Sequence, residues 1–260
     1  QGDDQFRTGL ADRETGALTY FITGAHDEDC TLYNAKVPLS DLPIGPNCES
    51  VFLNCEWGNF FEHFYNPITG QGFYSLKAGG SRPAPFRAED YERAIKKLVC
   101  SSGRYTNLSD NNRSNVNDYF GRILHILQDM GMSYHTKVEP HIVEKPLEMY
   151  VQDNWAEIAS STYFQGAVSV QGYSQTNYSP GRCIDPTVAM RKLALWSNVL
   201  PADQDYYDVC RNDPPRGLIC QLNQEKLSQN ATLMSAEATL FTTGYIDQIW
   251  RAINSDCICE

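Results

Sequence analysis

The stretch from Gly121 to Trp155 constrains this chain more than any other, because it gathers side chains that bind metal ions. Three of the five histidines of the protein lie within it, together with several acidic residues. His125 and Asp129 are four positions apart, so on a helix their side chains point to the same side, one turn apart. Imidazole nitrogens and carboxylate oxygens are the ligands that a catalytic zinc site takes. The stretch therefore predicts a metal site. Its candidate ligands are His125, Asp129, His135, His141 and Glu148.

An apolar stripe supports a helix over the first part of this stretch. Gly131 weakens the helix, so His135 is expected at or beyond its end. Pro146 is typical of the first turn of a helix, and that second helix would carry Glu148 in the same turn. Two helices and the bend between them would thus direct side chains toward one cavity. The stripe consists of Val116, Phe120, Ile123, Leu124 and Leu127.

The spacing His-x3-Asp-x5-His, which His125, Asp129 and His135 form, resembles the metal-binding core of the zinc-dependent phospholipase C family. The fungal zinc-dependent single-strand nucleases share the fold of that family. Residues 24–29 resemble its acidic metal-ligand segment. Residues 62–73 resemble its segment in which a histidine ligand is followed by Phe, an aromatic residue, Asp and Pro.

The resemblance implies a mostly α fold, a multi-helix phospholipase C-like or nuclease-like domain over residues 1–260. It covers about residues 18–155 and 231–253, where the last run resembles the closing helix of the family. Residues 156–230 have no match and are interpreted as an insertion.

Two segments outside the motifs have their own predicted structure. The first is a loop-rich segment stapled by disulfides, and the second contains extended backbone. Residues 30–60 hold three prolines and three cysteines, which favours a loop pinned by disulfides. Residues 156–184 are rich in Ser, Tyr, Gln and Gly. Short extended segments are expected there, for example Tyr163–Tyr173, which would give the fold a small β excursion.

The family resemblance also implies two ligand sets, in which Asp129 bridges the two metal ions. Asp29 and Asp129 are the predicted catalytic residues, and a metal-bound hydroxide would attack the phosphorus atom. The ligands of the first zinc would be Asp29, His63, His125 and Asp129. The ligands of the second zinc would be His135, His141 and Glu148.

Two of the predicted ligands in the first half of the chain have alternatives. Glu28 is the second choice for the position of Asp29, and the whole acidic segment is otherwise a solvated turn. His63 is otherwise a half-buried histidine in an aromatic cluster. The turn that begins at Asn66 favours the ligand role of His63, because it reproduces the turn of the family. The family usually has Asp at this position, and an amide keeps the turn-forming hydrogen bond but loses the charge.

His141 also has an alternative, because the commonest form of the family has His-x3-Glu at this point. Four residues before Glu148 lies Glu144, a third carboxylate, whereas imidazole suits zinc better. A third zinc is not expected. In the phospholipases a first-helix histidine and the amino group of an initial Trp bind it, whereas here Gln1 begins the chain and no histidine precedes His26. The start at Gln1 is interpreted as a processed or trimmed one.

Composition bounds the function further. The formal net charge of −11 argues against nonspecific affinity for nucleic-acid backbones, which needs a basic surface. No run of 18 apolar residues is present, so no transmembrane helix is expected. Nine cysteines without a C-x2-C pair indicate disulfides in an oxidising compartment. Because nine is odd, one thiol would be free or would link the chain to a disulfide-bonded partner.

These observations predict a secreted zinc-dependent phosphoesterase, which hydrolyses a phospholipid or another phosphodiester with two zinc ions. The first alternative is a catalytically lapsed, metal-stabilised domain that builds an assembly or binds a partner. The second alternative is a single-strand nuclease, which would need an aromatic pocket for base stacking.

Overall fold

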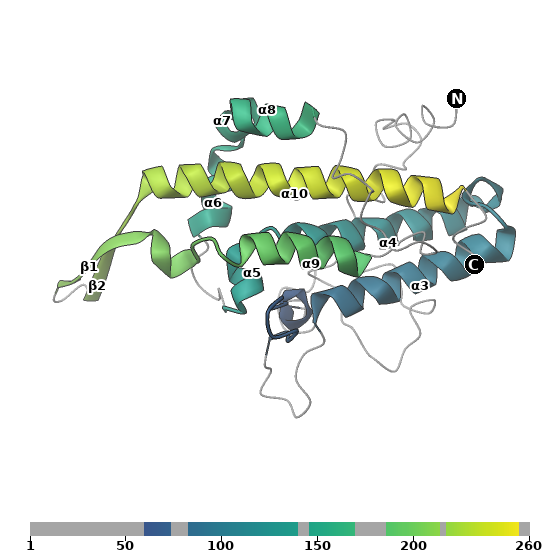
Figure 1. The fold of residues 1–260 in the computed structure, drawn as a ribbon, viewed down its shortest axis with the longest axis horizontal. Helices are drawn as coiled ribbons and strands as arrows, with labels where there is room; N and C mark the ends of the chain where they lie inside the picture. Colours follow the sequence, from purple (N-terminus) through teal and green to yellow (C-terminus); the bar gives the residue numbers. More distant parts are fainter. Residues whose placement is uncertain (1–59, 74–82, 140–145, 170–185, 214–216, 255–260) are drawn as a thin grey trace.

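The computed structural model of the chain describes residues 60–73, 83–139, 146–169, 186–213 and 217–254. This part of the protein is mostly helical, as the sequence predicts (Figure 1). The longest helix, α10 (Gln224–Ile253), runs along the length of the molecule. None of the described helices is both long and apolar enough to cross a membrane.

Four helices enclose the main hydrophobic core. They are α3 (Ala84–Ser102), α4 (Asp110–Asp129), α9 (Pro186–Ser197) and α10. Tyr91, Ile95 and Val99 recur at helical spacing on one face of α3, and all three are buried. Each fully buried side chain of this size contributes about 1.5–3 kcal/mol to the stability of the fold. Buried residues from the other three helices include Phe120, Ile123, Leu193 and Ile249.

The helices begin where the sequence supplies capping residues. The Ser109 side chain accepts a hydrogen bond from the backbone nitrogen of Asn112 at the start of α4. Asn223 does the same for Lys226 at the start of α10. Such caps satisfy backbone donors that a helix leaves unbonded and contribute about 1 kcal/mol each. α9 begins at Pro186, and proline is favoured in the first turn of a helix, where its missing backbone N–H would have no partner.

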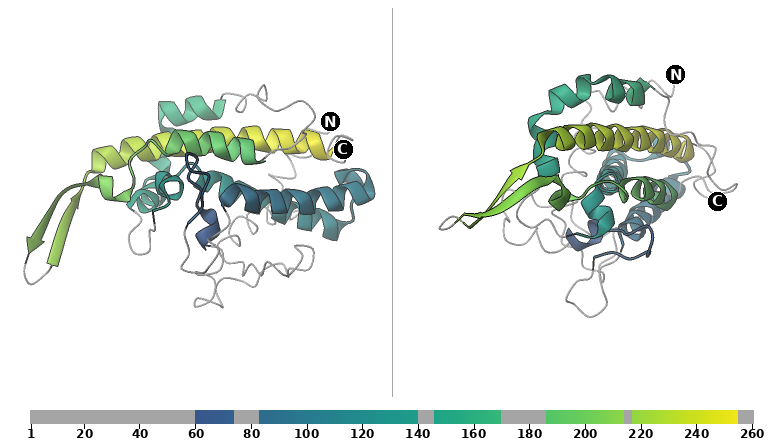
Figure 2. Two further views of the ribbon diagram at one scale, coloured as in Figure 1. Left: turned by 60° about the horizontal axis from the view of Figure 1, so that its bottom comes forward. Right: turned by 60° about the vertical axis from the view of Figure 1, so that its left-hand side comes forward.

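A second apolar cluster lies along the N-terminal half of α10. The helices α6 (Pro146–Asp153), α7 (Trp155–Ser160) and α8 (Thr162–Ser169) contribute to it. Figures 1 and 2 show α7 and α8 on the side of α10 that faces away from α3. The helix expected at Pro146 is therefore confirmed, with Glu148 in its first turn.

The expectation of an extended segment over Tyr163–Tyr173 is wrong for the part that the structure describes. Residues from Thr162 to Ser169 form α8 instead, and residues 170–173 lie outside the described ranges. Phe164 is buried against the cluster beside α10. This tertiary contact outweighs the local composition, which only weakly favours a strand.

A small β excursion is present, at a different place in the chain. The strands β1 (Tyr207–Asp213) and β2 (Gly217–Leu222) pair antiparallel, with Cys210 opposite Cys220 in the register. Figure 2 shows both strands extending away from the helices, beyond the first turns of α10. The hairpin lies within residues 156–230, which the family resemblance leaves unmatched.

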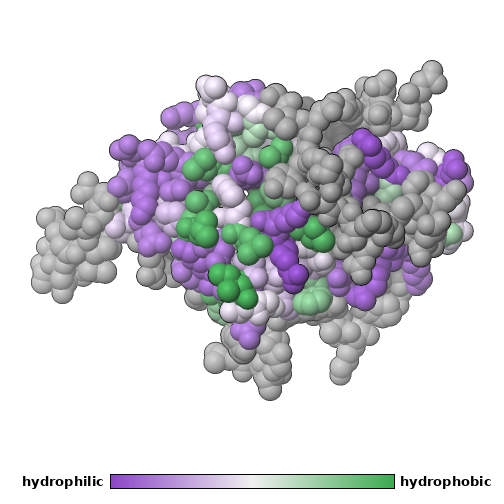
Figure 3. Space-filling view, in the orientation of Figure 1, coloured by the Kyte–Doolittle hydropathy of each residue, from purple (hydrophilic) through white to green (hydrophobic). Residues whose placement is uncertain are grey.

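The same unmatched stretch also supplies a core element. α9 packs against α3, α4, α5 and α10, and Met190, Leu193 and Ala194 are buried in the main core. Its outer side is partly apolar, with Leu195 49% exposed, and Val199, just after the end of the helix, is 79% exposed. Figure 3 shows apolar residues in the middle of this face of the molecule and hydrophilic residues toward its ends.

Short helical elements flank the long helices along the chain. They are η3 (Phe60–His63), η4 (Tyr105–Asn107), α5 (Ser133–Lys137) and η6 (Asp203–Tyr206). Cys100, near the end of α3, is disulfide-bonded. The bend between α4 and α5 passes close to α10, and this bend positions the candidate site.

Candidate metal centre

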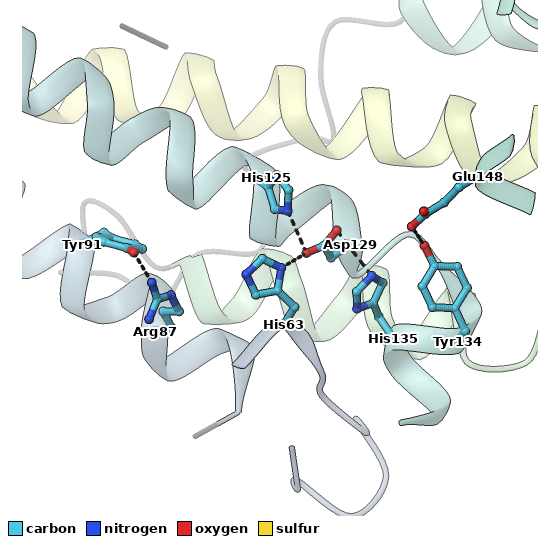
Figure 4. A network of polar contacts seen from close by, with 8 residues as sticks. All are labelled: His63, Arg87, Tyr91, His125, Asp129, Tyr134, His135 and Glu148. Carbon is cyan, nitrogen blue, oxygen red and sulfur yellow. Dashed lines mark hydrogen bonds and ion pairs between the residues drawn. The ribbon is translucent and has the colours of Figure 1, made fainter. Parts of the chain in front are cut away.

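Three short stretches of backbone place the candidate ligands. η3 ends at His63, the last turns of α4 carry His125 and Asp129, and α5 carries His135. The four side chains point toward one another (Figure 4). The helix predicted for His125 and Asp129 is thus present, and His135 lies beyond its end, as expected from Gly131.

Asp129 lies at the centre of the group. Its Oδ2 accepts a hydrogen bond of 2.7 Å from Nδ1 of His63 and lies 3.3 Å from Nε2 of His125. Its other oxygen, Oδ1, lies 3.6 Å from Nε2 of His135. One carboxylate therefore faces three imidazoles, two through one oxygen and the third through the other.

The donor atoms are close enough together for a metal ion. One ligand atom from each of His63, His125 and Asp129 lies within 4.8 Å of the others. Two ligand atoms of a tetrahedral zinc ion, each about 2.0–2.1 Å from the metal, are about 3.3 Å apart. The distance from His125 Nε2 to Asp129 Oδ2 is 3.3 Å, which matches that separation. The shorter contact of His63 would lengthen by about 0.6 Å on the same geometry.

The group is largely shielded from water. The side chains of His63 and His135 are 2% and 6% exposed, and those of Asp129 and His125 are 15% and 20% exposed. The rings of His63 and His125 meet edge to face with centroids 5.0 Å apart. His125 and Asp129 thus form the more accessible side of the group.

The histidines keep Asp129 ionised. Burial alone would raise the pKa of its carboxyl group, because burial disfavours the charged form. The charges of His125 and His135 and the hydrogen bonds from His125 and His63 outweigh burial and hold the pKa of Asp129 well below its usual range. The site therefore has an anionic centre at neutral pH, as a cation site requires.

The segment with His63 is joined directly to the segment with His135. The backbone nitrogen of Tyr65 donates to the carbonyl oxygen of His135 over 3.1 Å. The ring of Phe64 contacts the rings of Phe73 and His135, with centroids 5.1 and 4.9 Å away. Two segments about 70 residues apart in sequence are thereby fixed side by side.

The turn after His63 has the predicted form. The side-chain oxygen of Asn66 accepts hydrogen bonds from the backbone nitrogens of Ile68 and Thr69, over 2.9 and 3.1 Å. Gly70 closes the turn with φ +73°, a left-handed conformation that favours glycine. The amide of Asn66 thus forms the turn-stabilising hydrogen bonds that the sequence predicts for it.

Glu148 has a partner other than the central group. Its Oε1 accepts a hydrogen bond from the hydroxyl of Tyr134, the residue before His135. Within the described ranges, His63, His125 and Asp129 form the group that could hold a metal ion, and Glu148 is not part of it. Figure 4 shows Glu148 and Tyr134 on the far side of His135 from His63.

Several predicted ligands lie outside the described residues. They are Asp29 and its alternative Glu28, and His141 and its alternative Glu144. Their roles as ligands stay predictions.

Two polar contacts beside the site were not predicted from the sequence. Tyr134 bonds to Glu148, and Arg87 of α3 donates to Glu62, the neighbour of His63. The adjacency of Tyr134 to a candidate ligand was a usable signal for the first contact. No spacing pattern links Arg87 to Glu62, because the contact depends on how η3 meets α3.

No protein-family model matches the chain, and no curated protein matches it. Among solved structures, the chain is similar to the alpha-toxin of Clostridium absonum, with a TM-score of 0.46 and 12% identity over 92% of this chain. It is also similar to the alpha-toxin of Clostridium perfringens from avian strain SWCP, with a TM-score of 0.43 and 12% identity over 92% of this chain. The matches cover 65% and 62% of the toxins, so the chain spans slightly less than two thirds of their length.

Proposed function

We propose that the chain is a single-domain, secreted, zinc-dependent phosphoesterase that hydrolyses phosphodiesters in the manner of a phospholipase C. The convergence of His63 with His125 and Asp129 carries the proposal. The first of these residues is 66 positions from the last, yet their ligand atoms lie within 4.8 Å of one another. Two imidazoles and a carboxylate are a donor set that suits zinc.

Bound zinc would lower the pKa of a water molecule and neutralise the charge that develops on the phosphoryl oxygens. The residues of the chain have separate tasks in that chemistry. His63 and His125 would hold the ion on one side of Asp129, which would contribute an ionised carboxylate. His135 faces the second oxygen of Asp129, 3.6 Å away, which supports a bridging role for this carboxylate between two ions.

The proposed second ion would be held by His135, His141 and Glu148, and Asp29 would complete the first ligand set. The hydrogen bond from Tyr134 supports the role of Glu148, because it fixes the orientation of the carboxylate. Metal ligands commonly have such outer partners, whose loss lowers metal affinity about 10–100-fold.

Charge and cysteine content bear on the substrate and the compartment. A net charge of −11 favours small phosphodiesters or phospholipid head groups over nucleic acid, whose backbone binds basic surfaces. The disulfide at Cys100 supports an oxidising compartment and therefore secretion. An odd cysteine among the nine would allow a disulfide-linked partner.

The test measures metal content and hydrolysis in the same preparation. The full chain, expressed in an oxidising compartment and purified without chelator, is expected to contain two zinc ions and to hydrolyse a chromogenic phosphodiester. His125→Ala is expected to lose at least one ion and nearly all turnover. Gln128→Ala, a change at an exposed position in the same turn of α4, is the control and should keep both the metal content and the turnover of the wild type.

Each other outcome has a definite meaning. Full metal occupancy without turnover on phosphodiesters, phosphocholine lipids or single-stranded DNA would identify a metal-stabilised, non-catalytic domain. Turnover confined to single-stranded DNA would identify a nuclease. A wild-type chain without bound metal would refute the metal centre itself.

A further inference from the structure

The candidate ligand His63 lies on a very short element. η3 has 4 residues, which is one turn of 3-10 helix. A single turn is unstable on its own, because its few hydrogen bonds do not offset the entropy of fixing the backbone. The direction of the His63 imidazole must therefore be set by contacts with the rest of the protein.

Contacts on both sides of His63 supply that constraint. The residue before it, Glu62, accepts a hydrogen bond of 2.7 Å from Nη1 of Arg87. The residue after it, Phe64, accepts one of 3.2 Å at its carbonyl oxygen from the backbone nitrogen of Ala84. Both partners belong to the first turn of α3. η3 is thus attached to the start of α3 on both sides of the candidate ligand.

Arg87 is itself held firmly. Its side chain is 2% exposed, and its Nη2 donates to the hydroxyl of Tyr91 over 2.6 Å. Its guanidinium carbon lies 5.2 Å from the centre of the Tyr91 ring, and Tyr91 is buried in the core. A guanidinium group is planar and rigid, so it can hold two partners at fixed positions. Figure 4 shows Arg87 and Tyr91 beside His63 on the side away from His135.

We infer that Arg87 is a positioning residue of the metal centre, which fixes η3 through Glu62 and so directs the His63 imidazole toward Asp129. The inference rests on the proposed function, because it concerns the same metal site. A buried ion pair adds little net stability compared with apolar residues of similar size. Its main effect here is therefore on the geometry of His63.

The test removes the pair without changing the net charge. Glu62→Met combined with Arg87→Met replaces one negative and one positive side chain by apolar ones. Single substitutions are less suitable, because an unpaired charge near the site would alter metal affinity by itself. The double variant is expected to bind Zn²⁺ or Co²⁺ about 10–100-fold more weakly, as loss of an outer partner of a ligand typically does. The visible spectrum of the Co²⁺ form should also change, because the ligand geometry changes.

A second buried pair on α4 provides the matched control. Arg122 Nε donates to Asp118 Oδ2 over 2.9 Å, and both side chains are at most 5% exposed. Arg122 also lies over the ring of Tyr91, with its guanidinium carbon 5.9 Å from the centre. Asp118→Met combined with Arg122→Met is expected to change metal affinity less than threefold. An equal loss in both double variants would show a general loosening between α3 and α4 and would overturn the inference.

The remaining outcomes separate this inference from the proposed function. A wild-type chain that binds no metal refutes the proposed function. If the wild-type chain binds metal and the metal affinity of the Glu62→Met, Arg87→Met double variant is within threefold of the wild-type affinity, only the role of Arg87 is refuted. If this variant does not fold, Arg87→Lys decides instead. Lysine keeps the charge but lacks the planar fork, so at least a fivefold weaker affinity is expected, and an unchanged affinity overturns the inference.

Discussion

Asp129 has the largest influence of any single residue on the candidate centre, because its two oxygens face three imidazoles. Oδ2 meets His63 and His125, and Oδ1 meets His135. The pKa of this carboxyl group is held well below its usual range by those neighbours, although burial opposes the shift. The same charge that would bind a cation therefore also stabilises the metal-free fold.

Replacement of Asp129 by Asn tests both roles. We expect metal affinity to fall more than the 10–100-fold that is typical for an outer partner, because a ligand is lost. In chelator at neutral pH, we expect the free energy of unfolding to fall by about 1.5–3 kcal/mol, the usual contribution of hydrogen bonds to a charged group. The measurement is denaturant unfolding of the metal-free proteins.

The difference in the free energy of unfolding between wild type and Asp129→Asn should depend on pH in a definite direction. A carboxyl group with a lowered folded-state pKa stabilises the fold above its unfolded pKa, about 3.9 for Asp. The contribution is lost as the pH falls through the lower pKa of the folded state. The difference between wild type and Asp129→Asn should therefore be full at neutral pH and shrink in acid below about pH 4. A difference that grows in acid would contradict this account.

Single residues of the site differ in how far the sequence could predict them. The pair His125 and Asp129 followed from helical spacing, and the structure places both on one side of α4. His63 could be predicted only from the family resemblance, because nothing in its aromatic surroundings distinguishes a ligand from a core histidine. For the bond from Tyr134 to Glu148, the sequence offers only the position of Tyr134 beside a candidate ligand, because the contact itself depends on the approach of α5 to α6.

At the scale of elements, the bend between α4 and α5 determines the position of His135. Gly131 lies in this bend, where a Cβ atom would be 3.0 Å from Cβ of Ala238 on α10 and 3.0 Å from the carbonyl oxygen of Gln128. The sequence predicted that Gly131 would weaken the helix and that His135 would lie at or beyond its end. The structure adds that the absent side chain lets α10 approach the bend closely.

Gly131→Ala is expected to destabilise the protein by about 1–3 kcal/mol, the usual cost of overpacking, because Ala238 and the bend must move apart. Gly166→Ala is the matched control on α8, where a Cβ would meet nothing within 4 Å. That change should stabilise the protein by about 0.4–1 kcal/mol, because alanine favours the helix and restricts the unfolded chain. Denaturant unfolding of both variants measures the change in the free energy of unfolding, which should be negative for Gly131→Ala and positive for Gly166→Ala. Changes of the same sign would contradict the packing explanation.

The long helices were predictable, whereas most of the short elements were not; α6, which begins at Pro146, is an exception. Each long helix has an apolar stripe that recurs over several turns, and its first turn begins with Ser, Asn or Pro as a cap or first-turn residue. These helices are α3, α4, α9 and α10. α8 has 8 residues, and its Ser, Tyr and Gly content suggested extended backbone. Its packing on α10 decides its conformation, and this contact joins segments far apart in sequence.

At the scale of the whole molecule, the candidate centre links short segments to the end of a core helix. η3, the end of α4 and α5 meet at Asp129, and the backbone bond from Tyr65 to His135 links two of them. A metal ion bound by all three would act as a cross-link in the folded state only, because the unfolded chain does not assemble the site. Metal affinity is then part of the stability of the fold.

Removal of metal is therefore expected to lower the melting temperature. At a free zinc concentration of about 100 times the dissociation constant, one bound ion stabilises the fold by about 2.7 kcal/mol. For a chain of this length, that free energy corresponds to about 5–10 °C. Differential scanning calorimetry with and without chelator measures the shift, and added Zn²⁺ should restore it while Mg²⁺ should not, since imidazole ligands suit zinc.

The shift should also depend on pH, because protons compete with the metal for the imidazoles. We expect it to be large at pH 7.5 and to disappear near pH 5, below the usual pKa of histidine of about 6.5. His125→Ala, measured in parallel, should show little or no shift at either pH. A chelator effect that is the same in wild type and in this variant would place the stabilising ion elsewhere in the chain, and the cross-link between η3, α4 and α5 would have no part in it.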